Sequence, residues 1–371
     1  MRIDRFTREQ NERLCRILES RAAKAGAPLV RYLDCGTAVI RLICHTPAFL
    51  THVERQMTCA LREEAPRFDA TLVIWQERDL DVMALSGLQA VDESLYRQKR
   101  LARMGGASME TLVCHNDHYL RFWPLAEINI ESETITAWNP GDNTYYYAVK
   151  NLEPEEFIKR GHIFVTLIYR ICNIEGSSLA HGAVVGLNDI GVLFCAFGYR
   201  GKSTLCVNAL LDGFDYVSDD YFILGRKPGD MLRAWPIYSV VALSPQAYNA
   251  LYNRFDGKFL SNNGRKDKYM FNIAAYHGQF RRAYPVKCAM FPHIWDCGEP
   301  FIEEETGNTI RETALEELCF STLNNTGNMR DAITIGKLYN FTRDLPFYRI
   351  HLSRNLSKNT QCLREFLERQ R

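Results

Sequence analysis

The sequence predicts an α/β protein, mixed α+β over its whole length and divided into two domains. The chain has 371 residues, which is enough for about two hydrophobic cores. Residues 181–224 alternate apolar runs of strand type with a helical segment, as in a sheet covered by helices. Residues 110–149 carry short strand-like runs separated by Asn, Asp, Gly and Pro, which is typical of an antiparallel sheet. We therefore expect a mixed α/β domain over 1–175 and a second domain over 176–371.

The composition argues against several classes of function. The formal net charge is +1, so there is no general electrostatic reason for binding nucleic acid or a membrane surface. No apolar run approaches the ~18 residues of a transmembrane helix, and residues 1–14 lack the apolar core of a secretory signal. The 12 cysteines include no C-x-x-C pair, which favours reduced thiols in packed positions. We expect a cytoplasmic protein with neither nucleic-acid nor membrane partners, and its assembly into homo-oligomers stays open.

The first domain is predicted to begin with a helix. Thr7 and Gln10 form a capping box, and Gly26 ends the helical stripe. The other elements expected are strands at 29–33, 37–43 and 70–76, a helix opened by Pro47, a solvated Arg-rich helix before residue 110, the antiparallel strands of 110–149, and a helix at 153–172.

The second domain is predicted around an apolar strand at 191–195 and a helix that ends at Gly213. A second apolar strand follows and ends at Asp219 and Asp220. The other elements expected are strands within 235–245, a mobile polar and basic loop at 256–268, a buried strand at 286–292, an acidic segment at 302–310, a strand at 346–352 and a last amphipathic helix.

The turn between that first strand and its helix has the residues of a phosphate-binding loop. Gly198 and Gly201 leave room for backbone N–H groups to wrap phosphates. Lys202 is placed to reach the β- and γ-phosphates, and Ser203 or Thr204 can hold Mg²⁺. An ordinary helix start is the alternative, but the strand before, the helix after and the acidic pair downstream favour binding of ATP and Mg²⁺.

Three residues of this turn differ from the usual pattern of a phosphate-binding loop. Ala196 stands where the pattern G-x-x-x-x-G-K-[ST] has its first glycine, and alanine fits there if its φ is negative. Tyr199 is bulky for such a turn. Arg200 either adds a positive charge beside the phosphates or points to solvent.

Asp219 and Asp220 should emerge at the carboxyl edge of the sheet, where open α/β sheets bind their ligands. Adjacent strand residues point to opposite sides, so one carboxylate can face a metal while the other faces an attacking hydroxyl. A solvated acidic turn is the alternative for the pair alone, and behind a phosphate loop the pair favours catalysis. His181, at the start of the strand before the loop, is by itself more typical of a structural residue.

The pattern H-G-x-x-V … G-V-L … G-K-S-x … V-[SA]-D-D over residues 181–224 resembles the catalytic domain of bacterial HPr kinase/phosphorylases and their HPr kinase-related offshoots. Residues 1–175 look like the extra domain of the HPr kinase-related kinase B group. The resemblance implies a PEP-carboxykinase-like, P-loop nucleotide-binding fold for the C-terminal domain. It also implies Mg²⁺-dependent phosphoryl transfer from ATP, usually to a serine hydroxyl.

The same resemblance implies a role for each site residue. Lys202 would bind the β- and γ-phosphates, and Ser203 would bind the metal. Asp219 would act as the base toward the acceptor hydroxyl, Asp220 would assist metal or loop positioning, and His181 would sit against the aspartate.

The acceptor side departs from the family pattern. The segments L-E-x-R-G-x-G and P-G-R-N are missing, and only Arg265, Lys266 and Lys268 lie where a substrate loop would be. A protein serine, a peptide serine and a small-molecule hydroxyl all remain open as acceptors. A nucleotide-sensing or peptide-binding module that has lost turnover is the second hypothesis, motivated by Ala196 and Tyr199.

Three further patterns attract a structural interpretation. Cys114, His115 and His118 lack the spacing of a zinc site. The three tyrosines at 145–147 are predicted to pack within a strand, and the three glutamates at 303–305 are predicted to form a solvated loop.

Overall fold

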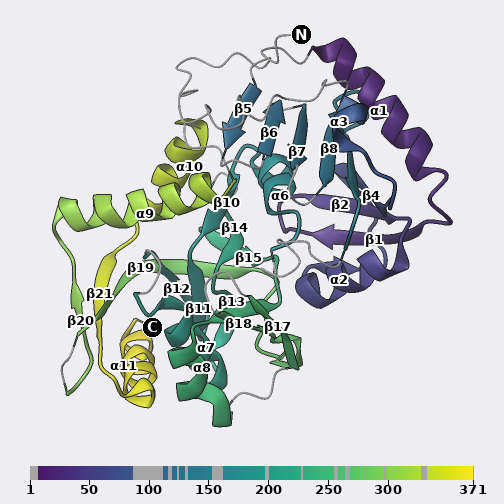
Figure 1. Cartoon of the computed structure of the whole chain (residues 1–371). Coiled ribbons are helices and arrows are strands. Elements are labelled where there is room, and N and C mark those ends of the chain that lie inside the picture. The colour runs from purple at the N-terminus through teal and green to yellow at the C-terminus, as the bar shows by residue number, and fades with distance from the viewer. Residues whose placement is uncertain are drawn as a thin grey trace, which may run out of the picture. The chain divides into compact units, whose positions relative to one another are not determined.

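The computed structural model describes residues 7–86, 112–115, 119–122, 125–129, 133–152, 162–196, 200–226, 229–254, 258–263, 268–276, 278–295, 298–326 and 332–370. The chain divides into two compact units (Figure 1). The first comprises Met1–Leu33, Val39–Glu54 and Arg62–Ile158, and the second comprises Asp34–Ala38, Arg55–Leu61 and Lys159–Arg371. Two short segments from the N-terminal part of the chain thus belong to the second unit. The predicted mixed α/β character is confirmed.

The first sheet has nine strands in the order β3-β1-β2-β4-β9-β8-β7-β6-β5. Its strands are β1 (Leu29–Asp34), β2 (Val39–Cys44), β3 (Leu61–Arg62), β4 (Ala70–Gln76), β5 (Leu112–His115), β6 (Tyr119–Phe122), β7 (Ala126–Asn129), β8 (Thr134–Asn139) and β9 (Thr144–Val149). Strands β5 to β9 pair antiparallel with one another, as predicted. They do not form a separate small sheet, because β9 also pairs in parallel with β4.

Helices α1 (Arg8–Ala22), α2 (Pro47–Met57) and α3 (Val82–Ser86) accompany this sheet. The predicted capping box of α1 is confirmed, with Gln10 N donating to Thr7 Oγ1 and Thr7 N donating to Gln10 Oε1. The helix ends at Ala22, before the Gly26 that was expected to stop it. The tyrosines at 145–147 are buried in β9, also as predicted.

The second sheet runs in the order β10-β14-β15-β19-β12-β11-β13, with β21 beside β19 and β20 beside β21. Its strands are β10 (Ser177–His181), β11 (Ala183–Leu187), β12 (Ile190–Phe194), β13 (Asp215–Ser218), β14 (Tyr221–Gly225), β15 (Arg233–Pro236), β19 (Tyr284–Ile294), β20 (Phe301–Glu304) and β21 (Phe347–Leu352). The helices of this unit are α6 (Val165–Cys172), α7 (Lys202–Leu211), α8 (Pro245–Leu251), α9 (Asn308–Thr326), α10 (Ala332–Thr342) and α11 (Leu356–Arg369), with short 3₁₀ turns η2 (Tyr252–Arg254) and η3 (Ala274–Tyr276).

A third sheet corrects part of the prediction of a mobile loop at 256–268, of which residues 256–257 and 264–267 lie outside the described residues. Strands β16 (Val240–Leu243), β17 (Lys258–Asn263) and β18 (Lys268–Asn272) pair in the order β16-β18-β17. The polar segment forms β17 because the neighbouring strand β18 buries Met270 and Phe271 and offers it a ladder partner. Polarity alone therefore misled the prediction.

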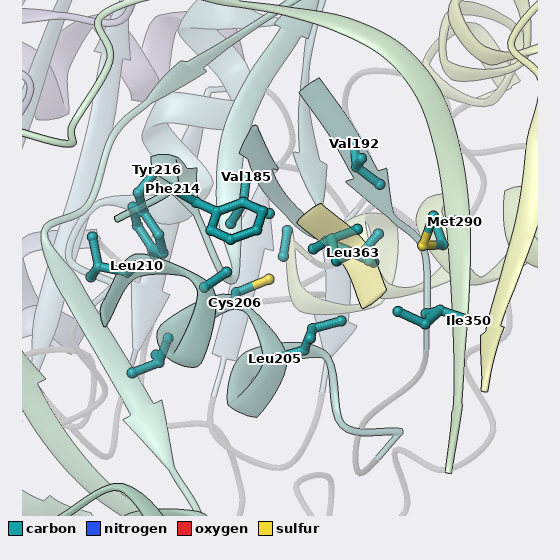
Figure 2. Packing of buried hydrophobic residues seen from close by; sticks show 14 of the residues in the cluster. Val185, Val192, Leu205, Cys206, Leu210, Phe214, Tyr216, Met290, Ile350 and Leu363 are labelled. Carbon is teal, nitrogen blue, oxygen red and sulfur yellow. The ribbon is translucent and has the colours of Figure 1, made fainter. Parts of the chain in front are cut away.

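Alternation along β12 divides the core of the second unit into two layers. Val192 and Phe194 belong to a cluster with α7, α8 and α11, several members of which appear in Figure 2. Leu193 and Cys195 belong to a cluster with α9 and α10. Successive side chains of a strand point to opposite faces, so β12 is covered on both sides. Burial on both faces explains the unbroken apolar sequence of β12. It also fixes the loop that follows β12 at the sheet edge.

Candidate active site at one edge of the second sheet

Strand directions bring four carboxyl ends to the same edge. Strand β12 is parallel to β19, and β19 is parallel to β21. Strand β13 is antiparallel to β11, which is itself antiparallel to β12, so β13 runs in the direction of β12. The segments that follow these strands therefore meet at one edge, as ligand-binding segments do in other open sheets.

The phosphate loop, defined as residues 196–204, leaves this edge after β12. Gly201 is the N-cap of α7 and has φ 89°, a left-handed conformation that favours glycine. A Cβ there would lie 2.8 Å from Leu352 Cδ1, so Gly201 packs closely on β21. Arg200 is exposed, and Gly198 and Tyr199 lie outside the described residues.

The first turn of α7 is arranged for an anion. Leu205 N donates to Gly201 O at 2.9 Å, which is the first helical hydrogen bond. The N–H groups of Lys202, Ser203 and Thr204 precede that bond and point past the helix terminus, by the geometry of any α-helix. The positive end of the helix dipole adds to their attraction for phosphate.

Lys202 joins the loop to the aspartate pair. Its side chain is buried, with 7% of the residue exposed. Its Nζ donates to the backbone carbonyl of Asp219 at 2.8 Å. Asp219 is only 3% exposed, and its carboxylate, after burial, is the main cause that raises the pKa of the Tyr216 hydroxyl. Asp219 therefore faces the interior beside Tyr216.

Asp220 faces a different environment, between two imidazoles. His181 Nε2 lies 2.5 Å from Asp220 Oδ1, and His162 Nε2 lies 3.1 Å from Asp220 Oδ2. The Asp220 side chain is 26% exposed. Burial by itself raises the pKa of Asp220, but His162, His181 and Lys202 together outweigh it and hold the pKa well below its usual range. We name these three residues, His162, His181 and Asp220, the Asp220 site.

Local hydrogen bonds explain why the two aspartates diverge. Ser218 Oγ donates to Tyr221 O and accepts from Asp220 N, which closes a tight turn at the end of β13. Asp220 O accepts from Gly182 N at 2.8 Å, which fixes Asp220 beside the end of β10. The two carboxylates thus have different surroundings, and the prediction that one faces a metal and the other an attacking hydroxyl stays a prediction.

His181 does not lie at the start of the strand that precedes the loop. It ends β10, and the β11–β12 hairpin separates it from the loop. That hairpin turns at Asn188 and Asp189, both with positive φ, as a two-residue hairpin turn requires. His181 still reaches the site, because β10 pairs with β14 directly after the aspartates.

Sequence reasoning missed His162. The predicted helix over 153–172 would have included it, but residues 162–164 are not helical and α6 begins only at Val165. The His162 ring packs edge-on against Tyr221 and Tyr238. A lone histidine before a helix carries no sequence signal for this contact.

A short segment from the N-terminal part of the chain supports His162. Gln56 Oε1 accepts from Ile163 N at 3.1 Å, and Gln56 O accepts from Ser239 N at 2.6 Å. Ser239 Oγ in turn accepts from Cys59 N at 2.9 Å. Both Ile163 and Ser239 adjoin residues of the ring contacts just described, so this segment holds the backbone on which those rings are mounted.

A magnesium ion shared with phosphates fits the residues present. Within the described residues no group of three or more His, Cys, Asp or Glu side chains is arranged to hold a metal by itself. Magnesium in phosphotransferases commonly needs only one or two protein oxygens, and phosphates and water supply the rest. Ser203, in the first turn of α7, and Asp220 offer such oxygens.

The prediction of a solvated loop at residues 303–305 is not confirmed. Glu303 and Glu305 are not simply solvated, because Glu303 pairs with His351 at 2.8 Å and Glu305 with Arg349 at 2.6 Å. The predicted solvated loop is wrong because Glu303 and Glu304 belong to β20, which pairs with β21.

Several residues of the predicted sites lie outside the described residues or are described by their backbone alone. Arg265, Lys266 and His118 lie outside the described residues. Lys268 begins β18, and Cys114 and His115 lie in β5, but only their backbones are described.

All ten described cysteines are free thiols, eight of them buried, in line with the expectation of packing residues. Among the helices that the structure describes, none is long and apolar enough to span a membrane.

Comparisons with known proteins give likenesses in structure but none in sequence. No protein-family model and no curated protein sequence matches this chain. In structure it is similar to the HPr(Ser) kinase/phosphatase from Coxiella burnetii, over 52% of this chain and 98% of that protein. The identity is 11% and the TM-score is 0.28, which does not show a shared activity.

Proposed function

We propose that this chain is an ATP- and Mg²⁺-dependent phosphotransferase of the HPr kinase-related kinase B group. It would move the γ-phosphoryl group of ATP to a hydroxyl group of a protein, a peptide or a small molecule. The observation that carries the proposal is the hydrogen bond from Lys202 Nζ to Asp219 O. Through this bond the lysine of a phosphate loop and the aspartate pair meet at one sheet edge.

The donor side follows from Lys202 and the first turn of α7. The N–H groups of that turn bind the phosphate oxygens, and the Lys202 ammonium, which has further N–H donors besides the one bound to Asp219, offsets charge on the γ-phosphate. Mg²⁺, which Ser203 would hold together with the phosphates, would supply additional charge neutralisation. Arg200, exposed in the loop, adds a cation on the same side.

On the acceptor side, the exposed fractions of the two side chains favour Asp220 over Asp219 as the residue that contacts the acceptor hydroxyl. Asp219 is almost fully buried, whereas about a quarter of the Asp220 side chain is exposed. The acceptor oxygen forms a bond to the γ-phosphorus, the bond from that phosphorus to the bridging oxygen breaks, and ADP leaves. The hydroxyl proton passes to Asp220. In a loose transition state this proton moves late, so a carboxylate of low pKa serves chiefly to orient the hydroxyl.

The test of this proposal is label transfer from γ-labelled ATP into protein and metabolite fractions of an extract from the source organism. Lys202→Ala should lower transfer by about 10²-fold or more, because it removes a positive charge from the transferred group. Lys287→Ala removes an exposed lysine of β19 and serves as the matched control. Undiminished transfer by a folded Lys202→Ala protein would sink the proposal.

Binding without transfer is the second candidate. Alanine occupies the first position of the phosphate loop, where the motif has glycine. A wild-type protein that binds ATP in a calorimeter but labels no fraction of the extract would support a nucleotide-sensing module in place of a kinase.

A further inference from the structure

Four rings gather at the same sheet edge, beside the phosphate loop. They are His293, Trp295, Phe301 and His351, which we name the Trp295 cluster. Phe301 stacks on His351 with ring centroids 4.1 Å apart and planes at 13°. Trp295 meets His351 edge-on at 5.6 Å and lies 5.4 Å from His293. The Asp220 site and the lysine do not use this cluster.

Two of these rings are unusually open to solvent. Trp295 is 49% exposed and Phe301 is 44% exposed, whereas His351 is buried behind them. Leaving large aromatic surface in water forgoes the favourable free energy of its burial. Gathered exposed aromatic surface of this kind commonly marks a binding site.

Two side-chain contacts and one backbone hydrogen bond place the cluster next to the loop. Ile294 Cγ1 lies 3.5 Å, and Leu352 Cδ1 2.8 Å, from the position of a Cβ on Gly201. Trp295 and His351 adjoin these two residues in sequence, and Trp295 N donates to Leu352 O at 2.9 Å. The cluster therefore begins one residue away from the contacts of the loop.

The alternation of side chains along a strand determines on which face of the sheet the rings lie. Ile294 and Leu352 turn toward Gly201, so their neighbours Trp295 and His351 turn to the opposite side of the sheet. A molecule anchored at the first turn of α7 must extend over the sheet edge to reach the rings. A nucleotide has this form, because a ribose separates its phosphates from a flat base.

The charge of the cluster suits a neutral flat ligand. Burial, followed by the neighbouring His351, Arg349 and Arg200, lowers the pKa of His293, so its ring is uncharged at neutral pH. Arg349 is paired with Glu305, and His351 is paired with Glu303. Arg200 is exposed and belongs to the phosphate loop, where the phosphates are expected.

We propose that the Trp295 cluster is the nucleobase subsite of the nucleotide whose phosphates bind at Gly201 and Lys202. The base stacks on the exposed face of Trp295, and His351, on which Phe301 stacks, packs edge-on against that ring. Stacking recognises the π-face that every base carries, so the subsite accepts different bases. This inference rests on the proposed nucleotide binding, and it adds where the base goes.

The test compares ATP with inorganic tripolyphosphate, which has the phosphates but no base. Both are titrated with Mg²⁺ into the full chain by calorimetry. Trp295→Ala should weaken ATP binding about tenfold, the effect of removing one base-stacking ring, and leave tripolyphosphate binding unchanged. Trp295→Phe should recover most of the loss. Tyr339→Ala, which removes a ring 51% exposed on α10, is the matched control and should bind both as wild type does.

The outcomes separate this inference from the proposed function. Unchanged ATP affinity in Trp295→Ala overturns the base subsite and leaves the phosphate site standing. Equal loss of ATP and tripolyphosphate also overturns it, because the ring then acts through the fold of the loop. Wild-type protein that binds neither ligand overturns the proposed function and this inference with it. Lys202→Ala should weaken both ligands together.

Discussion

The Asp220 site and the Trp295 cluster both combine histidines with a carboxylate at one edge of the same sheet, but they use them in opposite ways. At the Asp220 site the carboxylate is central, both rings bond to it, and its pKa is held low. Beside the Trp295 cluster, Glu303 pairs with His351 and has 49% of its side chain exposed, while the rings contact one another. The first arrangement holds a negative charge between two rings, and the second packs rings against one another.

The largest expected effect is a split between rate and affinity. Asp220→Asn should lower the rate of phosphoryl transfer by about 10²- to 10⁴-fold, because the acceptor hydroxyl loses the group that orients it. ATP affinity should change little. Glu303→Gln should do the reverse, keeping the rate and weakening ATP binding slightly through His351. Single-turnover kinetics and calorimetry measure the two quantities, and a fall in ATP affinity equal to the fall in rate for Asp220→Asn would contradict the comparison.

The two imidazoles of the Asp220 site should contribute unequally and not additively. His181→Gln should lower transfer by about tenfold and His162→Gln by less, because His181 lies closer to the carboxylate. The double variant should lose less than the product of the two single losses, since both rings act through one carboxylate. Independent, multiplicative losses in a double-mutant cycle would show that the rings act separately.

Gly201 lies between the two clusters, and its backbone conformation is the basis of a separate prediction. Gly201→Ala should lower the free energy of unfolding by about 1–3 kcal/mol, because φ is positive and Leu352 must move. Gly213, which follows the other end of α7, has φ 82° with nothing within 4 Å of a Cβ. Gly213→Ala therefore carries the backbone cost alone and should destabilise less. Urea titrations of the two variants give the difference, and equal losses would exclude the Leu352 contact.

The smallest effect expected is a pH dependence from His293. Its folded pKa lies below the ordinary value of about 6.5, so on acidification the unfolded chain binds the proton first. The free energy of unfolding should therefore fall as pH drops below about 6.5. His293→Phe keeps a ring but removes the titration, so its urea midpoint should change less between pH 7.5 and 5.5. An identical change in both proteins would show that His293 stays as easily protonated as in water.

Local patterns predicted much of this molecule because their causes are local. The α1 cap depends on Thr7 and Gln10, three residues apart, and the span of β4 follows from an apolar run with polar ends. The strand before Gly201 and the helix after it were predicted for the same reason. The parallel pairing of β9 with β4 was not, because it joins residues more than 70 positions apart that share no local pattern.

The candidate site divides in the same way. Lys202 and the aspartates follow from motif spacing. His162 does not, because its contact with Asp220 depends on tertiary packing, in which its ring lies against Tyr221 and Tyr238. The Trp295 cluster also has no linear motif, since its rings come from three different strands and their ends.

The support of His162 by Gln56 and Cys59 has a consequence for inheritance. A gene recombined near codon 175 would deliver the phosphate loop, the aspartates and His181, but none of the residues at 55–61 that bond to Ile163 and Ser239. Such a hybrid would encode the motif but would lack both His162 and the segment that supports it. A single crossover at that point therefore cannot graft the complete site onto a foreign partner.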